Sequence, residues 1–135
     1  MDAETYQEAT LESNISEDQV HKILEPLTEL VKLQGGPEAT ESLERVRSIL
    51  INAYYTLGLV GETGEIAEKM KKAIRDAGGQ MPVEETAKEL GDVTWYLSHL
   101  ARRLGTNFGQ IFQVNIDKLR DRMSRSKIQG SGDSR

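Results

Sequence analysis

The sequence is defined first by what it lacks. It has no cysteine, which excludes disulfide bonds, thiolate metal sites and a thiol nucleophile. It shows no apolar run long enough to cross a membrane and no signal peptide, so we expect a cytoplasmic protein without a membrane partner. Basic residues are outnumbered, 17 against 22 acidic ones, and the net charge of −5 argues against a nucleic-acid polymer as the partner.

Strand signals are also missing. Every long segment repeats its apolar residues at the 3.6-residue period of a helix. The two Phe and one Trp among 135 residues favour a core of Leu, Ile, Val and Ala, which is typical of helical bundles. The sequence therefore predicts an all-α bundle of about four to five helices that oligomerises through helix packing.

The length predicts a single domain, which we divide into three parts. Residues 1–36 are expected to form N-terminal helices, with Pro26 kinking or interrupting the second one. Residues 37–124 form a helical core with helices over about 38–76 and 83–104 and a last helix capped by Asn107. Residues 125–135 form a polar tail that would be disordered unless it docks on something.

Four acidic residues of the core follow a regular spacing. Glu62 and Glu65 lie three residues apart, as do Glu89 and Asp92, and 23 residues separate the two pairs. Residues three apart share a helix face, and a turn can bring the two pairs side by side. Four carboxylates this close need protons or a cation to offset their repulsion. Because hard oxygen ligands suit Mg²⁺ or Mn²⁺, the spacing predicts a metal site.

The apolar residues of the same helices also indicate that the carboxylates have a function. A helix turns by about 100° per residue, so the apolar stripe of the long helix, when it is continued, passes through Gly61 to Glu65. A similar stripe of the next helix includes Glu89. The first stripe consists of Val46, Ile49, Leu50, Ala53, Tyr54 and Leu57. A carboxylate is costly to bury unpaired, so a carboxylate on the core side usually has a function. We expect Glu65 and Glu89 to face the core.

Several cationic side chains are candidates for binding phosphate. Lys118 and Arg122 share a face of the last helix with Asn115, and an arginine can hold two phosphate oxygens at once. The alternative is an exposed basic turn that favours the helix dipole. Lys69 or Lys72, one turn or two beyond Glu65, is a further candidate, although a run of lysines is usually solvated.

Other metal chemistries fit poorly. A di-iron bundle needs Glu-x-x-His pairs, but His99 follows Tyr96 and His21 follows Asp18 at that offset. No loop has the alternating Asp/Asn residues of an EF-hand. There is also no Gly-Lys-Thr phosphate loop and no serine-hydrolase elbow. Both histidines are expected to be structural or exposed.

The acidic segments resemble a known family. Residues 59–68 and 88–97, which contain the two carboxylate pairs, are similar to the signature of the MazG-like all-α nucleoside triphosphate pyrophosphohydrolases. Residues 115–122 resemble the basic last helix of that family, and residues 130–135 resemble an ending found in some short single-domain members. The resemblance covers about residues 45–135.

The resemblance implies hydrolysis of a nucleoside triphosphate between its α and β phosphates, giving a monophosphate and pyrophosphate. Mg²⁺ or Mn²⁺ would be bound by the four carboxylates, with Glu62 or Glu65 orienting or deprotonating the attacking water. The expected nucleotide-binding residues are Lys69, Tyr96, Asn115, Lys118 and Arg122, and Tyr96 is equally open to a packing role. The resemblance also implies a homodimer or homotetramer. We expect base preference to depend on the N-terminal third.

Two alternatives remain open at this stage. One is a relative that acts on phosphoribosyl-ATP with the same metal chemistry. The other is a non-catalytic helical module that binds nucleotides or a partner, in which the carboxylates are only structural.

Overall fold

The computed structural model describes residues 1–125, and no strand occurs among them. The elements are α1 (Ala3–Ala9), the 3₁₀ turn η1 (Thr10–Ser13), α2 (Ser16–Gln34), α3 (Pro37–Asp76), α4 (Val83–Arg103) and α5 (Phe108–Ser124). The predicted all-α class is therefore confirmed. Apart from Arg125, the predicted polar tail lies outside the described residues.

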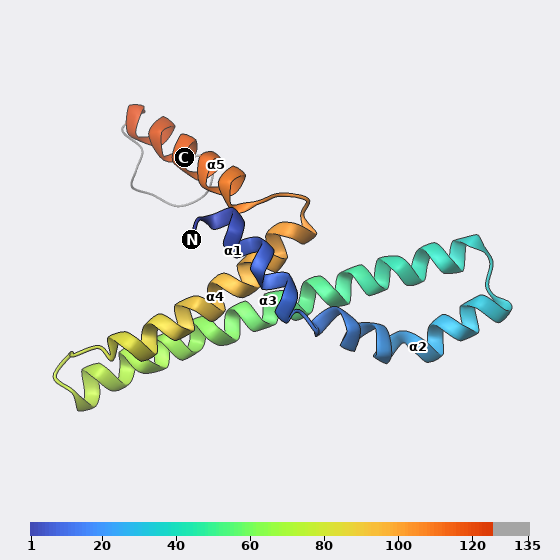
Figure 1. Ribbon diagram of the computed structural model, residues 1–135, viewed down its shortest axis with the longest axis horizontal. Coiled ribbons are helices and arrows are strands. Elements are labelled where there is room, and N and C mark those ends of the chain that lie inside the picture. The colour runs from blue at the N-terminus through green and yellow to red at the C-terminus, as the bar shows by residue number, and fades with distance from the viewer. Residues whose placement is uncertain (126–135) are drawn as a thin grey trace.

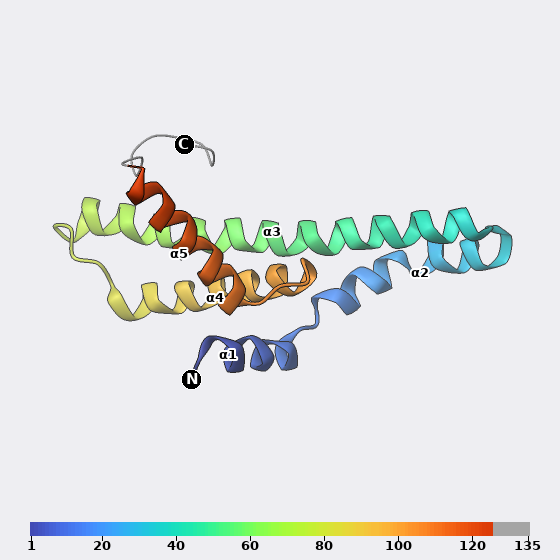
Figure 2. The same cartoon turned by 90° about the horizontal axis from the view of Figure 1, so that it is seen from above.

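The 40-residue helix α3 is the spine of the fold. Pro37 begins it, where a missing N–H costs nothing, and Gly78 and Gly79, with φ of 58° and 86°, follow its end. Figures 1 and 2 show α2 folded back along the first half of α3 and α4 along its second half. Residues on α3 and α4 are thereby placed side by side near the turn that joins the two helices.

Pro26 lies inside α2 without ending it. The ribbon of α2 changes direction near its middle in Figure 1, as expected where a proline removes a backbone donor and its ring crowds the preceding turn. Of the two predicted outcomes, a kink or an interruption, the chain adopts the kink.

The core lies where α2, α3 and α4 meet. Its buried residues are Val20, Leu24, Ile51 and Tyr55. Tyr55 is completely buried, and its ring stacks on His99 with centroids 5.0 Å apart and planes 9° apart. His99 is thus a structural residue of the core, which is one of the two alternatives predicted for the histidines.

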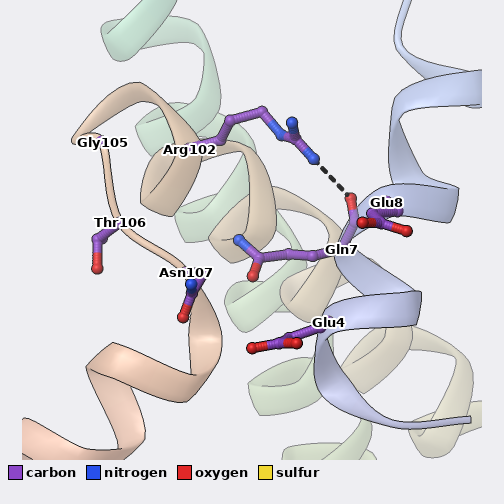
Figure 3. A pocket seen from close by; sticks show the side chains of 7 residues that line it. All are labelled: Glu4, Gln7, Glu8, Arg102, Gly105, Thr106 and Asn107. Atoms are coloured by element: carbon purple, nitrogen blue, oxygen red, sulfur yellow. Dashed lines mark hydrogen bonds between the residues drawn. The ribbon is translucent and has the colours of Figure 1, made fainter.

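The N-terminal segment docks on α4 through polar contacts. The hydroxyls of Thr10 and Ser98 lie 2.6 Å apart, and the Gln7 side chain accepts a hydrogen bond from the Phe108 backbone N–H at 2.8 Å. Arg102 donates to the Gln7 carbonyl at 3.2 Å across a polar cavity of 420 Å³ (Figure 3). Because both ends of the Gln7 amide are engaged within the protein, we assign this region to the docking of α1 and α5.

Asn107 caps α5 as predicted. Its side chain accepts from the Gln110 N–H at 2.9 Å, and the Gln110 side chain accepts from the Asn107 N–H at 3.2 Å. This reciprocal pair satisfies two donors that the helix itself cannot use. Before it, Gly105 adopts a φ of 71°, which permits the sharp turn out of α4.

The predicted apolar stripe of α3 does not face the core of the single chain. Val46 and Leu57 are 44% and 71% exposed, whereas Leu43, Ile51 and Tyr55 are buried. Both sets have helical spacing, and α2 and α4 cover the second set. The expectation that this stripe carries Glu65 into the core was therefore wrong.

Among the described residues, no helix is both long and apolar enough to span a membrane.

Candidate metal and nucleotide site

Three of the four predicted carboxylates meet between α3 and α4. Glu62, Glu89 and Asp92 each offer an oxygen atom that lies within 4.8 Å of the others. Glu62 comes from α3, and the other two come from one face of α4, because they are three residues apart. The antiparallel packing of these helices thus produces the juxtaposition that the spacing predicts.

Glu65 lies outside this group of three. Its residue is exposed, and its carboxylate is not among the oxygens that lie within 4.8 Å of one another. Its charge nevertheless acts on Glu62, one turn earlier. Burial, and after it the carboxylates of Asp92, Glu65 and Glu89, raise the pKa of Glu62. Both burial and the neighbouring negative charges therefore disfavour the charged form of Glu62.

Lys69 offsets part of this negative charge. Its ammonium group lies 2.7 Å from a carboxylate oxygen of Glu89, and the two side chains are only 23% and 15% exposed. The hydrogen bond to Glu89 raises the pKa of Lys69. Lys72 instead contacts Glu68, at 3.4 Å. Of the two lysines considered from the sequence, Lys69 is the one that contacts the cluster.

The donor set fits a hard divalent cation. All three groups are carboxylates, the ligand type that Mg²⁺ and Mn²⁺ prefer. Oxygen ligands at about 2.1 Å from an octahedral ion lie at most about 4.2 Å apart. Small side-chain rotations would therefore bring Glu62, Glu89 and Asp92 onto one ion.

A cavity of 380 Å³ adjoins the carboxylates. It is lined by Ser13, Glu62, Asp92, Trp95 and Tyr96. Its volume lies within the range of about 300–1,000 Å³ that is usual for small-molecule sites. Two aromatic rings and two carboxylates thus border the same space, a combination that suits a ligand with a flat ring at one end and anionic groups at the other.

Tyr96 both lines this cavity and packs against α3. A Cβ atom built on Gly58 would lie 2.1 Å from the ring of Tyr96. Gly58 is thus the point where the absence of a side chain lets the Tyr96 ring approach α3 closely. No described atom outside the local backbone lies within 4 Å of a Cβ built on Gly61 or Gly64.

The sequence predicted that the N-terminal third contributes to base preference, but it did not identify the residues of that segment that reach this site. Trp95 donates its indole N–H to the Ser13 hydroxyl at 2.8 Å, and Tyr6 donates to the Gly91 carbonyl at 3.2 Å. The paired residues are 82 and 85 positions apart in the sequence, so no local spacing predicts these contacts. The only available hint was that the single tryptophan follows the second carboxylate pair.

The three residues of α5 that were predicted to bind phosphate do not lie on the helices that carry the carboxylates. These residues are Asn115, Lys118 and Arg122. Within residues 1–125, α5 packs against α1 and α4 and makes no contact with α3, and Figure 1 shows it leaving the α3–α4 pair. Asn115 and Lys118 are exposed, whereas Arg122 is buried. A role for these residues in phosphate binding stays a prediction.

The comparisons with known proteins identify the family of the stretch that contains these carboxylates. The family model described as the MazG nucleotide pyrophosphohydrolase domain matches residues 52–125, which include all four predicted carboxylates. The Gene 37 protein of Mycobacterium phage L5 is 48% identical over 86 residues, which is 62% of this chain and 75% of that protein. No solved structure shows a significant match. With more than half of its length matched, the chain belongs to the MazG nucleotide pyrophosphohydrolase domain family.

Proposed function

We propose that the protein hydrolyses ribo- or deoxyribonucleoside triphosphates between the α and β phosphates, giving a nucleoside monophosphate and pyrophosphate. The observation that carries this proposal is the meeting of Glu62, Glu89 and Asp92 in a chain of the MazG family. Because nucleoside triphosphates are the substrate, we place the reaction in the cytoplasm.

The carboxylates are the proposed ligands of Mg²⁺ or Mn²⁺, with Glu65 joining the other three from the next turn of α3. A bound divalent cation neutralises phosphate charge and makes a bound water more acidic. Glu62 or Glu65 orients the attacking water and accepts its proton.

Cationic residues complete the phosphate side of the proposal. Lys69 already lies at the cluster through its contact with Glu89, and it is the proposed partner of a phosphate oxygen nearby. Asn115, Lys118 and Arg122 are proposed to reach the outer phosphates from α5. Tyr96, in the wall of the cavity, is proposed to contact the sugar or base.

We also propose that the active form is a homodimer or a dimer of dimers. Six residues of α3 are exposed and alternate at spacings of four and three: Val46, Leu50, Ala53, Leu57, Val60 and Gly64. Such a pattern forms the seam between two packed helices, and here α2 and α4 leave it uncovered. A second copy of α3 fits this seam because both helices then bury the same apolar residues.

The oligomer is tested by Leu57→Glu, which places a charge at the centre of the seam. We expect a smaller particle in size-exclusion chromatography with light scattering. Thr56→Glu, at an exposed neighbouring position outside the seam, is the matched control and should keep the wild-type size. A wild-type protein that is monomeric at micromolar concentration would contradict the proposal.

The reaction is tested with a panel of nucleoside triphosphates in Mg²⁺, Mn²⁺ or EDTA. We expect metal-dependent release of pyrophosphate and monophosphate, which Asp92→Asn abolishes while the circular dichroism spectrum is kept. Glu84→Gln removes an exposed carboxylate from the first turn of the same helix and should leave turnover unchanged. Release of inorganic phosphate and a diphosphate, or no turnover of any triphosphate, would overturn the proposed function.

A further inference from the structure

The cavity beside the carboxylates has a wall whose role the proposed reaction does not explain. Ser13, at the end of η1, lines the same space as Glu62 and Asp92. If the phosphates of a nucleotide lie at the carboxylates, the nucleoside faces the remaining walls, which are Ser13, Trp95 and Tyr96. Trp95 and Tyr96 have rings that can stack on a ligand. Ser13 has none, so its specific contact with a ligand can only be a hydrogen bond of its hydroxyl.

The direction of the Ser13 hydroxyl follows from its two partners. Trp95 lies 2.8 Å away and its indole nitrogen can only donate, so Ser13 Oγ must accept there. The Thr10 carbonyl lies 3.1 Å away and can only accept, so Ser13 must give its proton to that oxygen. A hydroxyl has one proton and two lone pairs. Among residues 1–125 these two bonds use the proton and one lone pair, which leaves a single acceptor position.

The neighbours of Ser13 hold this arrangement in place. Trp95 packs edge-on against Tyr96 with centroids 4.9 Å apart and lies 4.2 Å from the ring of His99. Thr10 is buried, and its hydroxyl lies 2.6 Å from that of Ser98. Both partners are fixed by packing, so turning the proton toward a ligand would take it away from the Thr10 carbonyl. Such a fixed acceptor discriminates more sharply than a free hydroxyl would.

We propose that Ser13 is a specificity-determining residue that accepts a hydrogen bond from a donor group of the nucleoside, either a sugar hydroxyl or an exocyclic amino group of the base. This inference rests on the proposed function, because it places the nucleoside in the cavity beside the carboxylates. It predicts a preference for nucleotides that carry the donor over analogues that present an acceptor or nothing at that position.

The experiment compares wild type, Ser13→Ala and Ser13→Thr on pairs of triphosphates that differ in one donor. CTP against UTP and ATP against ITP test the base amino group, whereas ATP against its 2′-deoxy and 3′-deoxy analogues tests the sugar hydroxyls. We expect wild type to favour the donor-bearing member in one of these arms. A single neutral hydrogen bond corresponds to about a 2- to 10-fold preference in kcat/KM, which Ser13→Ala should abolish and Ser13→Thr should retain.

A binding readout separates failure of this inference from failure of the proposed function. Trp95 is the only tryptophan in the chain, so its fluorescence reports ligand binding at this wall without turnover. Titration of the same nucleotides as non-hydrolysable α,β-methylene analogues in Mg²⁺ should show the same preference in Kd, again lost in Ser13→Ala. If no triphosphate is hydrolysed but this preference is found, the proposed function falls and the role of Ser13 stands.

Two results would overturn the role of Ser13. In the first, Ser13→Ala keeps every wild-type preference, which would mean that the hydroxyl does not contact the nucleoside. In the second, Ser13→Ala weakens donor-bearing and donor-free nucleotides equally, which would mean that it only supports the wall. The expected result is instead a loss that falls mainly on the donor-bearing nucleotides.

Discussion

Replacing Gly58 by alanine tests the contact between α3 and the wall of the cavity. A Cβ atom there would lie 2.1 Å from the Tyr96 ring, so the ring must move. Overpacking of this kind costs about 1–3 kcal/mol. Alanine in place of glycine inside a helix stabilises it by about 1 kcal/mol. The net expectation is a loss of roughly 0–2 kcal/mol in the free energy of unfolding.

A double-mutant cycle isolates the clash from the helix propensity. In a Tyr96→Ala background the obstacle is gone, so Gly58→Ala should stabilise by about 1 kcal/mol. The coupling between the two positions is then about 1–3 kcal/mol, measured by urea unfolding followed by circular dichroism at one fixed protein concentration. Gly91→Ala, in α4, is the control, because a Cβ there meets no described atom within 4 Å outside the local backbone. If Gly58→Ala stabilises equally in both backgrounds, Tyr96 does not pack on Gly58.

Three further predictions concern the helix cap, the buried histidine and the metal. Asn107→Ala should lower the free energy of unfolding by about 1 kcal/mol in a urea titration, whereas Asn107→Asp should keep most of it; equal stability of both would contradict the cap. Burial lowers the pKa of His99, so the unfolded chain binds the proton first, and stability should be complete above about pH 6.5 and fall below it, by at most about 1.4 kcal/mol per pH unit. His99→Gln should remove this part of the pH dependence, and an unchanged profile would refute it. Mg²⁺ at a hundred times its Kd should stabilise the wild type by about 2.7 kcal/mol, and thermal melts of Asp92→Asn should lose this shift if Asp92 is a ligand.

Local patterns predicted the elements well. The 3.6-residue period and the Asn107 cap placed the long helices within a few residues of their observed bounds. The spacing of the carboxylate pairs predicted that Glu62, Glu89 and Asp92 meet, because two helices joined by a short turn pack side by side.

Faces and distant contacts were harder to predict. Periodicity shows that a helix has apolar faces, but it does not show which face its neighbours in the same chain cover. For this reason the stripe through Leu57 was assigned to the core, although α2 and α4 pack against the face of Ile51 and Tyr55. The wall formed by Ser13 and Trp95 depends on a tertiary contact across 82 residues, which no local rule contains.

The origin of that wall matters for engineering the protein. The family match begins at residue 52, and the carboxylate cluster lies inside it, whereas Ser13 belongs to the segment before it. If the roles proposed above hold, the residues that cleave the bond all lie within the matched stretch, whereas one residue that reads the nucleoside comes from a segment outside it. Grafting a different N-terminal segment onto the same α3–α4 pair would then change which nucleotides are accepted without altering a single metal ligand.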